Sequence, residues 1–213
     1  MIEYKNLSLA QQVYHMIEEN ILSGKYEIGK IISEKSLSAE MGVSRNLAAD
    51  AMARLNREKL IKYTEDGAVV LGVTKEDLED FFVIKRTIEV LASKMAAGRM
   101  SADGLKELKE ILDRQEHYAQ KSQVAKVIDL DTKFHDYIYM ESGSPVFEGV
   151  LSTIHHKLKK YRLASLENEN RIYESLKEHR EIYNALCEGD AEKVEKLMLT
   201  HIENAYESMI GGK

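Results

Sequence analysis

Helix breakers are scarce along this chain, and their scarcity limits the folds open to it. The 213 residues include 12 glycines and a single proline, Pro145. Glycine and proline are the residues that most often end a helix, so long stretches without them favour helices joined by short turns. The sequence therefore predicts a mainly α fold.

The first third of the chain has a pattern of its own. Two segments rich in apolar residues, 60–63 and 68–71, flank a turn that contains Gly67, as expected for a two-stranded hairpin. Before them, three short helices are predicted, each with a serine at its amino end: 8–23, 33–41 and 44–58. This order predicts a winged helix-turn-helix DNA-binding domain over residues 1–72, with the hairpin as its wing.

The helix 44–58 would be the one that reads DNA, and Ser44, Arg45 and Asn46 open it. Residues 44–62 carry five basic and two acidic side chains in a chain whose formal net charge is −6. A local basic strip on an acidic protein suits contact with double-stranded DNA at one end. Ala49 and Asp50, however, follow where a second cation is expected, and each missing phosphate contact weakens binding.

An all-helical domain is predicted over residues 73–213. Their apolar residues recur at helical spacing, and short connections make neighbouring helices antiparallel. The expected architecture is an antiparallel six-helix bundle with helices at about 74–99, 101–121, 123–141, 145–166, 170–187 and 190–210.

Four polar residues interrupt the apolar stripes of this bundle. Asp131 and His135 lie four residues apart in the third helix, whereas His179 and His201 lie in the fifth and sixth. A single histidine there is usually a hydrogen-bonded core residue, but a buried carboxylate with three imidazoles is costly unless something pairs them. One divalent cation satisfies all four, so we predict a metal site.

Helix geometry allows these residues to meet. His179 precedes the Gly189 joint by ten residues and His201 follows it by twelve, so the two differ in height by only about 3–5 Å on antiparallel helices. The ligand types favour zinc or nickel, with manganese or iron as further options. A six-coordinate ion would leave two positions for water or a carboxylate, whereas a closed site would be structural only.

Lys85 interrupts the apolar stripe of the first bundle helix, and two interpretations stay open. It can bind an anionic effector in a pocket, or pair with Glu89 one turn later. His155 and His156 are consecutive, so at most one of them faces the core. His15 and His117 lie at expected surface positions.

Two other features of the sequence bear on the cellular compartment of the protein. The sequence contains neither the roughly 18 consecutive apolar residues of a membrane span nor a secretory segment. The single cysteine, Cys187, excludes an internal disulfide and fits a reducing compartment. We expect a cytoplasmic protein without a membrane partner.

Several motifs together resemble the GntR family of bacterial transcription regulators, in its FadR-like branch and VanR-like subgroup. The effector domain of that branch, of the FCD type, is similar at Asp131-Thr132-Lys133-Phe134-His135, Ser142-Gly143-Ser144-Pro145, Glu178-His179-Arg180 and Thr200-His201-Ile202. The winged helix of the family is similar at Gln12-Val13-Tyr14, Ile21-Leu22-Ser23-Gly24-Lys25, Ile32-Ser33-Glu34-Lys35-Ser36-Leu37, Met41-Gly42-Val43-Ser44-Arg45 and Arg54-Leu55.

The resemblance implies a homodimer that binds a near-palindromic operator and responds to a small organic acid, and it assigns metal binding, effector binding and dimerisation to residues 73–213. It implies a metal held by Asp131, His135, His179 and His201. It also implies DNA contacts at Lys35, at Arg45 and near Gly67, and it places Lys85 where the family has an effector-binding arginine. The chain departs from the family at Asn46-Leu47-Ala48-Ala49-Asp50 and in the acidic wing tip Thr64-Glu65-Asp66.

The leading hypothesis is a ligand-responsive repressor, not an enzyme. Two alternatives remain: a family member that has lost DNA binding and acts through protein contacts, and a small metallohydrolase that activates water on the ion. No residue near the cluster is an evident general base for the second alternative.

Overall fold

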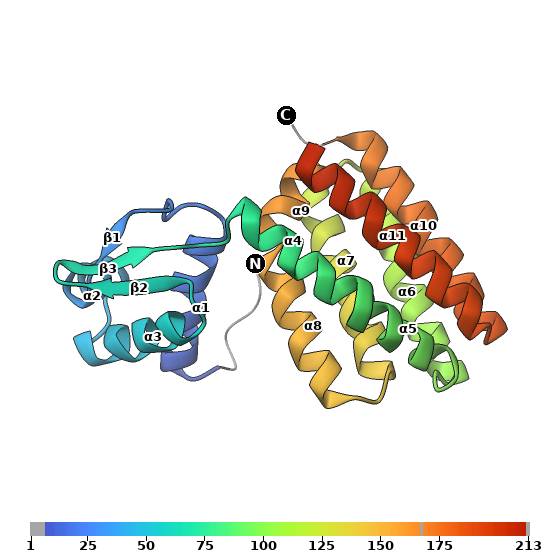
Figure 1. The fold of residues 1–213 in the computed structure, drawn as a ribbon, viewed down its shortest axis with the longest axis horizontal. Coiled ribbons are helices and arrows are strands. Elements are labelled where there is room, and N and C mark those ends of the chain that lie inside the picture. The colour runs from blue at the N-terminus through green and yellow to red at the C-terminus, as the bar shows by residue number, and fades with distance from the viewer. Residues whose placement is uncertain (1–6, 167, 212–213) are drawn as a thin grey trace. The chain divides into compact units, whose positions relative to one another are not determined.

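The computed structural model describes residues 7–166 and 168–211, and these form two compact units that divide between Thr74 and Lys75 (Figure 1). The first unit contains three helices and a small sheet. Its helices are α1 (Leu9–Leu22), α2 (Glu34–Met41) and α3 (Arg45–Arg57). Its strands are β1 (Ile31–Ile32), β2 (Ile61–Thr64) and β3 (Gly67–Val70).

The serines act as helix caps, as the sequence predicted. The hydroxyls of Ser8, Ser33 and Ser44 accept hydrogen bonds from backbone N–H groups in the first turns of α1, α2 and α3. Such bonds satisfy donors that have no partner inside the helix. The helices then pack together, with α3 contacting both α1 and α2.

The wing has one strand more than predicted. The sheet order is β1-β3-β2, and β1 pairs antiparallel with β3 through Ile31–Val69 and Ile32–Ala68. A strand of two residues carries too little alternation to be recognised in sequence. Gly67 begins β3, the central strand, with φ +136°, and a Cβ built there would come within 2.7 Å of the Ile32 carbonyl oxygen.

The second unit is a helical bundle (Figure 1). Its core is apolar, with fully buried side chains such as Phe82, Leu108, Phe134, Ile138 and Met198. The helices of the bundle are α4 (Lys75–Ile84), η2 (Lys85–Glu89), α5 (Val90–Ala97), α6 (Ala102–Ala119), α7 (Val124–Glu141), α8 (Pro145–Lys157), α9 (Lys159–Leu166), α10 (Glu169–Glu188) and α11 (Ala191–Gly211). Over the described residues, no helix is long and apolar enough to cross a membrane.

Two of the predicted helices differ in detail from the observed ones. The first, expected as one regular α-helix, contains the π-helical turn η2 between α4 and α5. The fourth, expected to run unbroken over 145–166, is interrupted at Leu158, whose φ and ψ of −79° and −2° end α8. Neither glycine nor proline marks this interruption in the sequence, while the Leu158 side chain is buried in the core.

Candidate functional site

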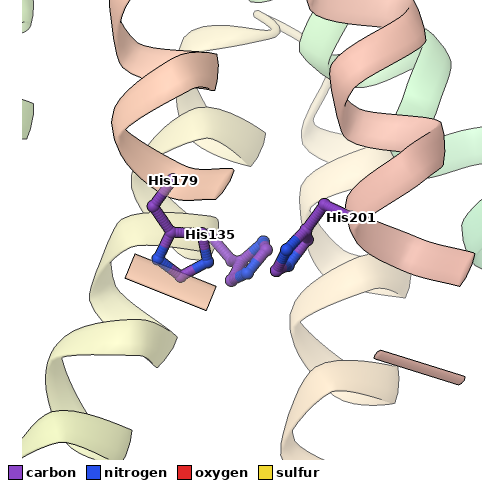
Figure 2. A group of neighbouring side chains, drawn as sticks. All are labelled: His135, His179 and His201. Atoms are coloured by element: carbon purple, nitrogen blue, oxygen red, sulfur yellow. The ribbon is translucent and has the colours of Figure 1, made fainter. Parts of the chain in front are cut away.

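Three of the predicted ligand residues lie together in the interior of the bundle. His135 comes from α7, His179 from α10 and His201 from α11, and their rings point toward one another (Figure 2). The ring centroids are 4.8 to 5.2 Å apart. One nitrogen from each ring lies within 4.8 Å of the others, so a single ion could contact all three.

Asp131 reaches the same cluster from one turn earlier in α7. Its Oδ1 lies 3.6 Å from Nε2 of His179, and the side chain is buried. Ligand atoms about 2.0–2.1 Å from a tetrahedral ion are roughly 3.4 Å apart. The separation of Asp131 from His179 is therefore close to that of two ligands of one ion.

Each of the three histidines has its outer ring nitrogen next to an acceptor. Nδ1 of His135 lies 3.0 Å from Oε1 of Glu89. Nδ1 of His179 lies 3.1 Å from Oε1 of Gln115, and Nδ1 of His201 lies 2.6 Å from Oε2 of Glu178. The hydrogen bonds of His179 and His201 favour the tautomer that carries its proton on Nδ1, which leaves the lone pair of Nε2 free. At His135, whose Nδ1 forms no hydrogen bond to the described residues, the charge of the adjacent Glu89 carboxylate favours the same tautomer.

The inner nitrogens are consistent with this interpretation. Nε2 of His179 is buried and has no hydrogen-bond partner within the described part of the chain. Burial lowers the pKa of His135 and holds that of His179 well below its ordinary value, so both rings are neutral, as a metal requires. A cluster with a lone pair left unused in the interior fits a divalent ion.

The acidic member of the cluster is ionised. Burial acts to raise the pKa of Asp131, but the positive charge of Arg162 holds it well below its ordinary value. Nη2 of Arg162 donates a short hydrogen bond to Oδ2 of Asp131, which leaves Oδ1 directed at His179. Asp131 can therefore bind an ion through one oxygen while Arg162 holds the other.

A small cavity adjoins the cluster, with a volume of about 40 Å³. One water needs about 10–15 Å³ on this measure, so there is room for roughly three water-sized groups. Lys85 lines the cavity, and its Nζ lies 2.5 Å from Oε2 of Glu89, the ion pair that the sequence left open. The cavity is also lined by Asp131, His135, His155, Arg162, Ser165, Arg171, Ser175 and His201, with apolar side chains between them.

Sequence reasoning missed Arg162 and Arg171, and it left open whether His155 or His156 faces the core. His155, Arg162 and Arg171 all line the cavity. Each is at most 6% exposed. His155, Leu158 and Arg162 follow one another at helical spacing, so the buried Leu158 was a signal that the other two face inward. Arg171 forms a bidentate ion pair with Glu178, which in turn holds His201.

The predicted DNA-contacting residues lie in the first unit, apart from this cavity. Lys35 is exposed in the first turn of α2, and Arg45 and Asn46 are exposed in the first turn of α3. Ser44 is exposed too, but its hydroxyl already accepts from the Leu47 N–H at 3.3 Å. The close approach of Gly67 to the Ile32 carbonyl gives that glycine a structural role in the wing.

One cation of the basic strip is already neutralised. Arg54 donates to Glu58 at 3.0 Å and stacks 3.6 Å above the ring of Tyr14. Arg45 and Lys35, in contrast, extend from exposed positions at the amino ends of α3 and α2. The amino ends of α2 and α3 therefore carry positive charge that is more accessible to DNA than the charge of Arg54.

Comparison with known proteins adds a further finding. Residues 9–70 match the family described as bacterial regulatory proteins, gntR family, and residues 80–204 match the FCD domain. The HTH-type transcriptional repressor RspR of Escherichia coli K12 is 22% identical over 200 residues, which cover 93% of this chain and 88% of RspR. The gluconate operon transcriptional repressor of Bacillus licheniformis is 24% identical over 196 residues, covering 90% and 79%.

Solved structures share the fold. The structure of E. coli McbR/YncC superimposes with a TM-score of 0.82 at 19% identity, covering 96% of this chain and 98% of the other. A transcriptional regulator described as GntR from Rhodococcus sp. RHA1 gives a TM-score of 0.75 at 22% identity, with coverage of 96% and 98%.

Proposed function

This chain belongs to the GntR family of bacterial regulatory proteins and carries an FCD domain, and we propose that it is a metal-containing repressor that a small carboxylate releases from DNA. The family membership makes it a DNA-binding transcription regulator. The ion, the effector class, the dimer and the contact residues are parts of the proposal.

The observation that supports a bound metal ion is the arrangement of the three imidazoles. Their Nδ1 atoms face Glu89, Gln115 and Glu178, while one nitrogen of each ring can meet the others at a single point. We propose that His135, His179 and His201, with Asp131, hold a divalent ion. Zinc or nickel suits three imidazoles best, with manganese or iron as further options.

The ion would supply concentrated positive charge beside the cavity, where a carboxylate can bind. We propose that Lys85 also binds the carboxylate of the effector, because it lies on the cavity wall, where it forms an ion pair with Glu89. The cavity has room for roughly three water-sized groups, so an acid larger than the smallest ones must open it. That opening is the structural change by which an effector could alter the rest of the bundle.

DNA would be read by the amino ends of α2 and α3. We assign Lys35, Arg45 and Asn46 to contacts with a duplex, Ser44 to capping α3 beside them, and Gly67 to the shape of the wing. A helix placed with its amino end in the major groove is the common geometry of helix-turn-helix proteins, and dimers of them bind two half-sites. We therefore propose a homodimer on a near-palindromic operator in the cytoplasm.

The test uses the full chain. Metal content is measured on purified protein, and binding to a duplex from upstream of its own gene is followed by fluorescence anisotropy over a range of salt. We expect one ion per chain, specific binding that weakens steeply with salt, and release by a small carboxylate. If folded protein binds neither this duplex nor random DNA at low salt, the proposal of DNA binding is contradicted. If the purified protein contains no metal, the proposed ion site is contradicted.

A further inference from the structure

Among the polar side chains of the cavity that have no part in the proposal above, two come from the joint between α8 and α9. His155 lies in the last turn of α8, and Arg162 lies in the first turn of α9. The interruption at Leu158 separates them. Both side chains line the cavity and are buried.

His155 is a buried polar side chain that forms no hydrogen bond with the other described residues. Neither ring nitrogen has a hydrogen-bond partner within the described ranges, 7–166 and 168–211. A buried donor without an acceptor is unfavourable, and native proteins keep such groups where a ligand or a water completes them. The ring therefore points to a ligand that the chain itself does not provide.

The position of His155 separates it from the three-histidine set. Its Nε2 lies 3.5 Å from Oδ2 of Asp131, and its ring centroid lies 4.7 Å from that of His135. It can share a contact point with Asp131 and His135, but it is not part of the group formed by His135, His179 and His201. His155 therefore flanks the proposed ion-binding set on the side of Asp131.

Arg162 lies against the same side. Its Nη2 donates to Oδ2 of Asp131, to Oγ1 of Thr132 at 3.0 Å and to the carbonyl oxygen of Ile128 at 3.3 Å. Its Nη1 donates to the carbonyl oxygen of His155 at 3.3 Å. The guanidinium is thus fixed beside His155. A guanidinium carries five N–H donors, so it can donate to a ligand carboxylate as well as to these protein acceptors.

The charges around the cavity indicate the kind of ligand. Three buried cations each lie against a carboxylate, in the pairs Lys85–Glu89, Arg162–Asp131 and Arg171–Glu178, and Arg171 also lies 3.9 Å from the exposed Glu174. These three pairs carry no net charge before an ion binds, and a divalent ion adds two positive charges without adding an acid. Two negative charges on a ligand would restore the balance.

We propose that His155 and Arg162 form a carboxylate-binding pair, and that the effector is a short dicarboxylate whose second carboxylate faces the ion-binding residues. The inference rests on the proposed metal site. A short diacid is favoured over a long one because the cavity volume is about 40 Å³. One carboxylate would accept from the His155 ring and from Arg162.

The test compares malonate with propionate, which has the same number of carbons but one charge. Both are titrated by calorimetry into the full-length, zinc-loaded protein. We expect malonate to bind at least tenfold more tightly. The variant His155→Leu should keep its zinc and lose at least tenfold in malonate affinity, while propionate binding stays the same. His155→Asn, which retains an N–H donor, should recover part of the loss.

The controls keep the inference separate from the proposed function. His117→Leu, at an exposed position of α6, should bind malonate like the unmodified protein. Equal affinity for malonate and propionate would overturn the inference, and so would unchanged malonate binding in His155→Leu. Loss of zinc from that variant would overturn it too, because His155 would then be a metal ligand. Absence of zinc from the unmodified protein would instead remove the proposed metal site.

Discussion

The carboxylate of Glu89 lies 3.0 Å from Nδ1 of His135, and this contact joins the first bundle helix to the helix that carries two of the proposed ligands. Glu89 also lies 2.5 Å from Nζ of Lys85 and accepts a hydrogen bond of 2.7 Å from the Tyr139 hydroxyl. Burial acts to raise the pKa of Glu89, but the charge of Lys85 holds that pKa well below its ordinary value. One ionised carboxylate therefore orients both a histidine and the cavity lysine.

We expect Glu89→Gln to weaken both metal binding and stability. Outer partners of metal-bound histidines typically contribute about 10- to 100-fold in metal affinity. The variant also leaves the buried Lys85 without its counter-charge, which costs about 3–5 kcal/mol when a buried pair is broken. Competition with a chelator of known affinity measures the first effect, and chemical denaturation measures the second.

The matched control is Tyr139→Phe, which removes one hydrogen bond to Glu89 and leaves the ion pair in place. It should lower the free energy of unfolding by about 1 kcal/mol and change metal affinity far less than Glu89→Gln does. If the two variants have equal metal affinity, Glu89 does not orient His135 as the distances suggest.

Removing the metal should destabilise the protein. A ligand present at about 1,000 times its Kd stabilises the folded state by about 4 kcal/mol, which corresponds to a Tm higher by roughly 10 °C for a protein of this size. We expect a chelator to lower Tm by that amount and His201→Ala to abolish the response to added zinc. His117→Ala, at an exposed position, should respond like the unmodified protein. An unchanged Tm in chelator would argue against a resident ion.

Arg45→Ala should weaken DNA binding at all sequences tested. Arg45 is exposed in the first turn of α3, and the loss of one phosphate contact lowers the slope of log K against log salt by about one. Anisotropy titrations between low and moderate salt measure this slope. Asp50→Asn, which removes a negative charge from the same helix, should act in the opposite direction.

The control for these two variants is Arg114→Ala, which removes an exposed cation from α6 in the second unit. It should leave both the affinity for DNA and the salt slope unchanged. If it weakens binding as much as Arg45→Ala, the DNA-contacting surface lies elsewhere.

Gly67→Ala should destabilise the winged domain. The added Cβ would lie 2.7 Å from the Ile32 carbonyl oxygen, and φ is +136°, a conformation that residues other than glycine rarely adopt. Such strain costs about 1–3 kcal/mol. Gly149→Ala is the matched change, because Gly149 lies inside α8 with nothing within 4 Å of its added Cβ. It should stabilise the protein by up to about 1 kcal/mol, as thermal melts of both variants would show.

Much of the architecture was predictable because helix signals are local. Serines cap α1, α2 and α3 as expected. The helical spacing of Asp131, His135, His179 and His201 correctly predicted that all four side chains are buried in the bundle. The two-residue strand β1 was missed because its pairing partner, β3, lies more than thirty residues later in the sequence. A pairing of that kind leaves no periodic trace in so short a segment.

Caps and apolar periodicity act within a few residues along the chain, so most helices and their buried faces could be predicted from the amino-acid sequence. The amino-acid sequence could not show which side chains from other helices contact Asp131 and the three histidines. The contacts of Glu89 with His135, Gln115 with His179 and Arg162 with Asp131 join residues 31 to 64 positions apart. Only tertiary packing brings such groups within hydrogen-bond distance, and it also encloses the cavity that His155 and Arg162 line together with residues of other helices.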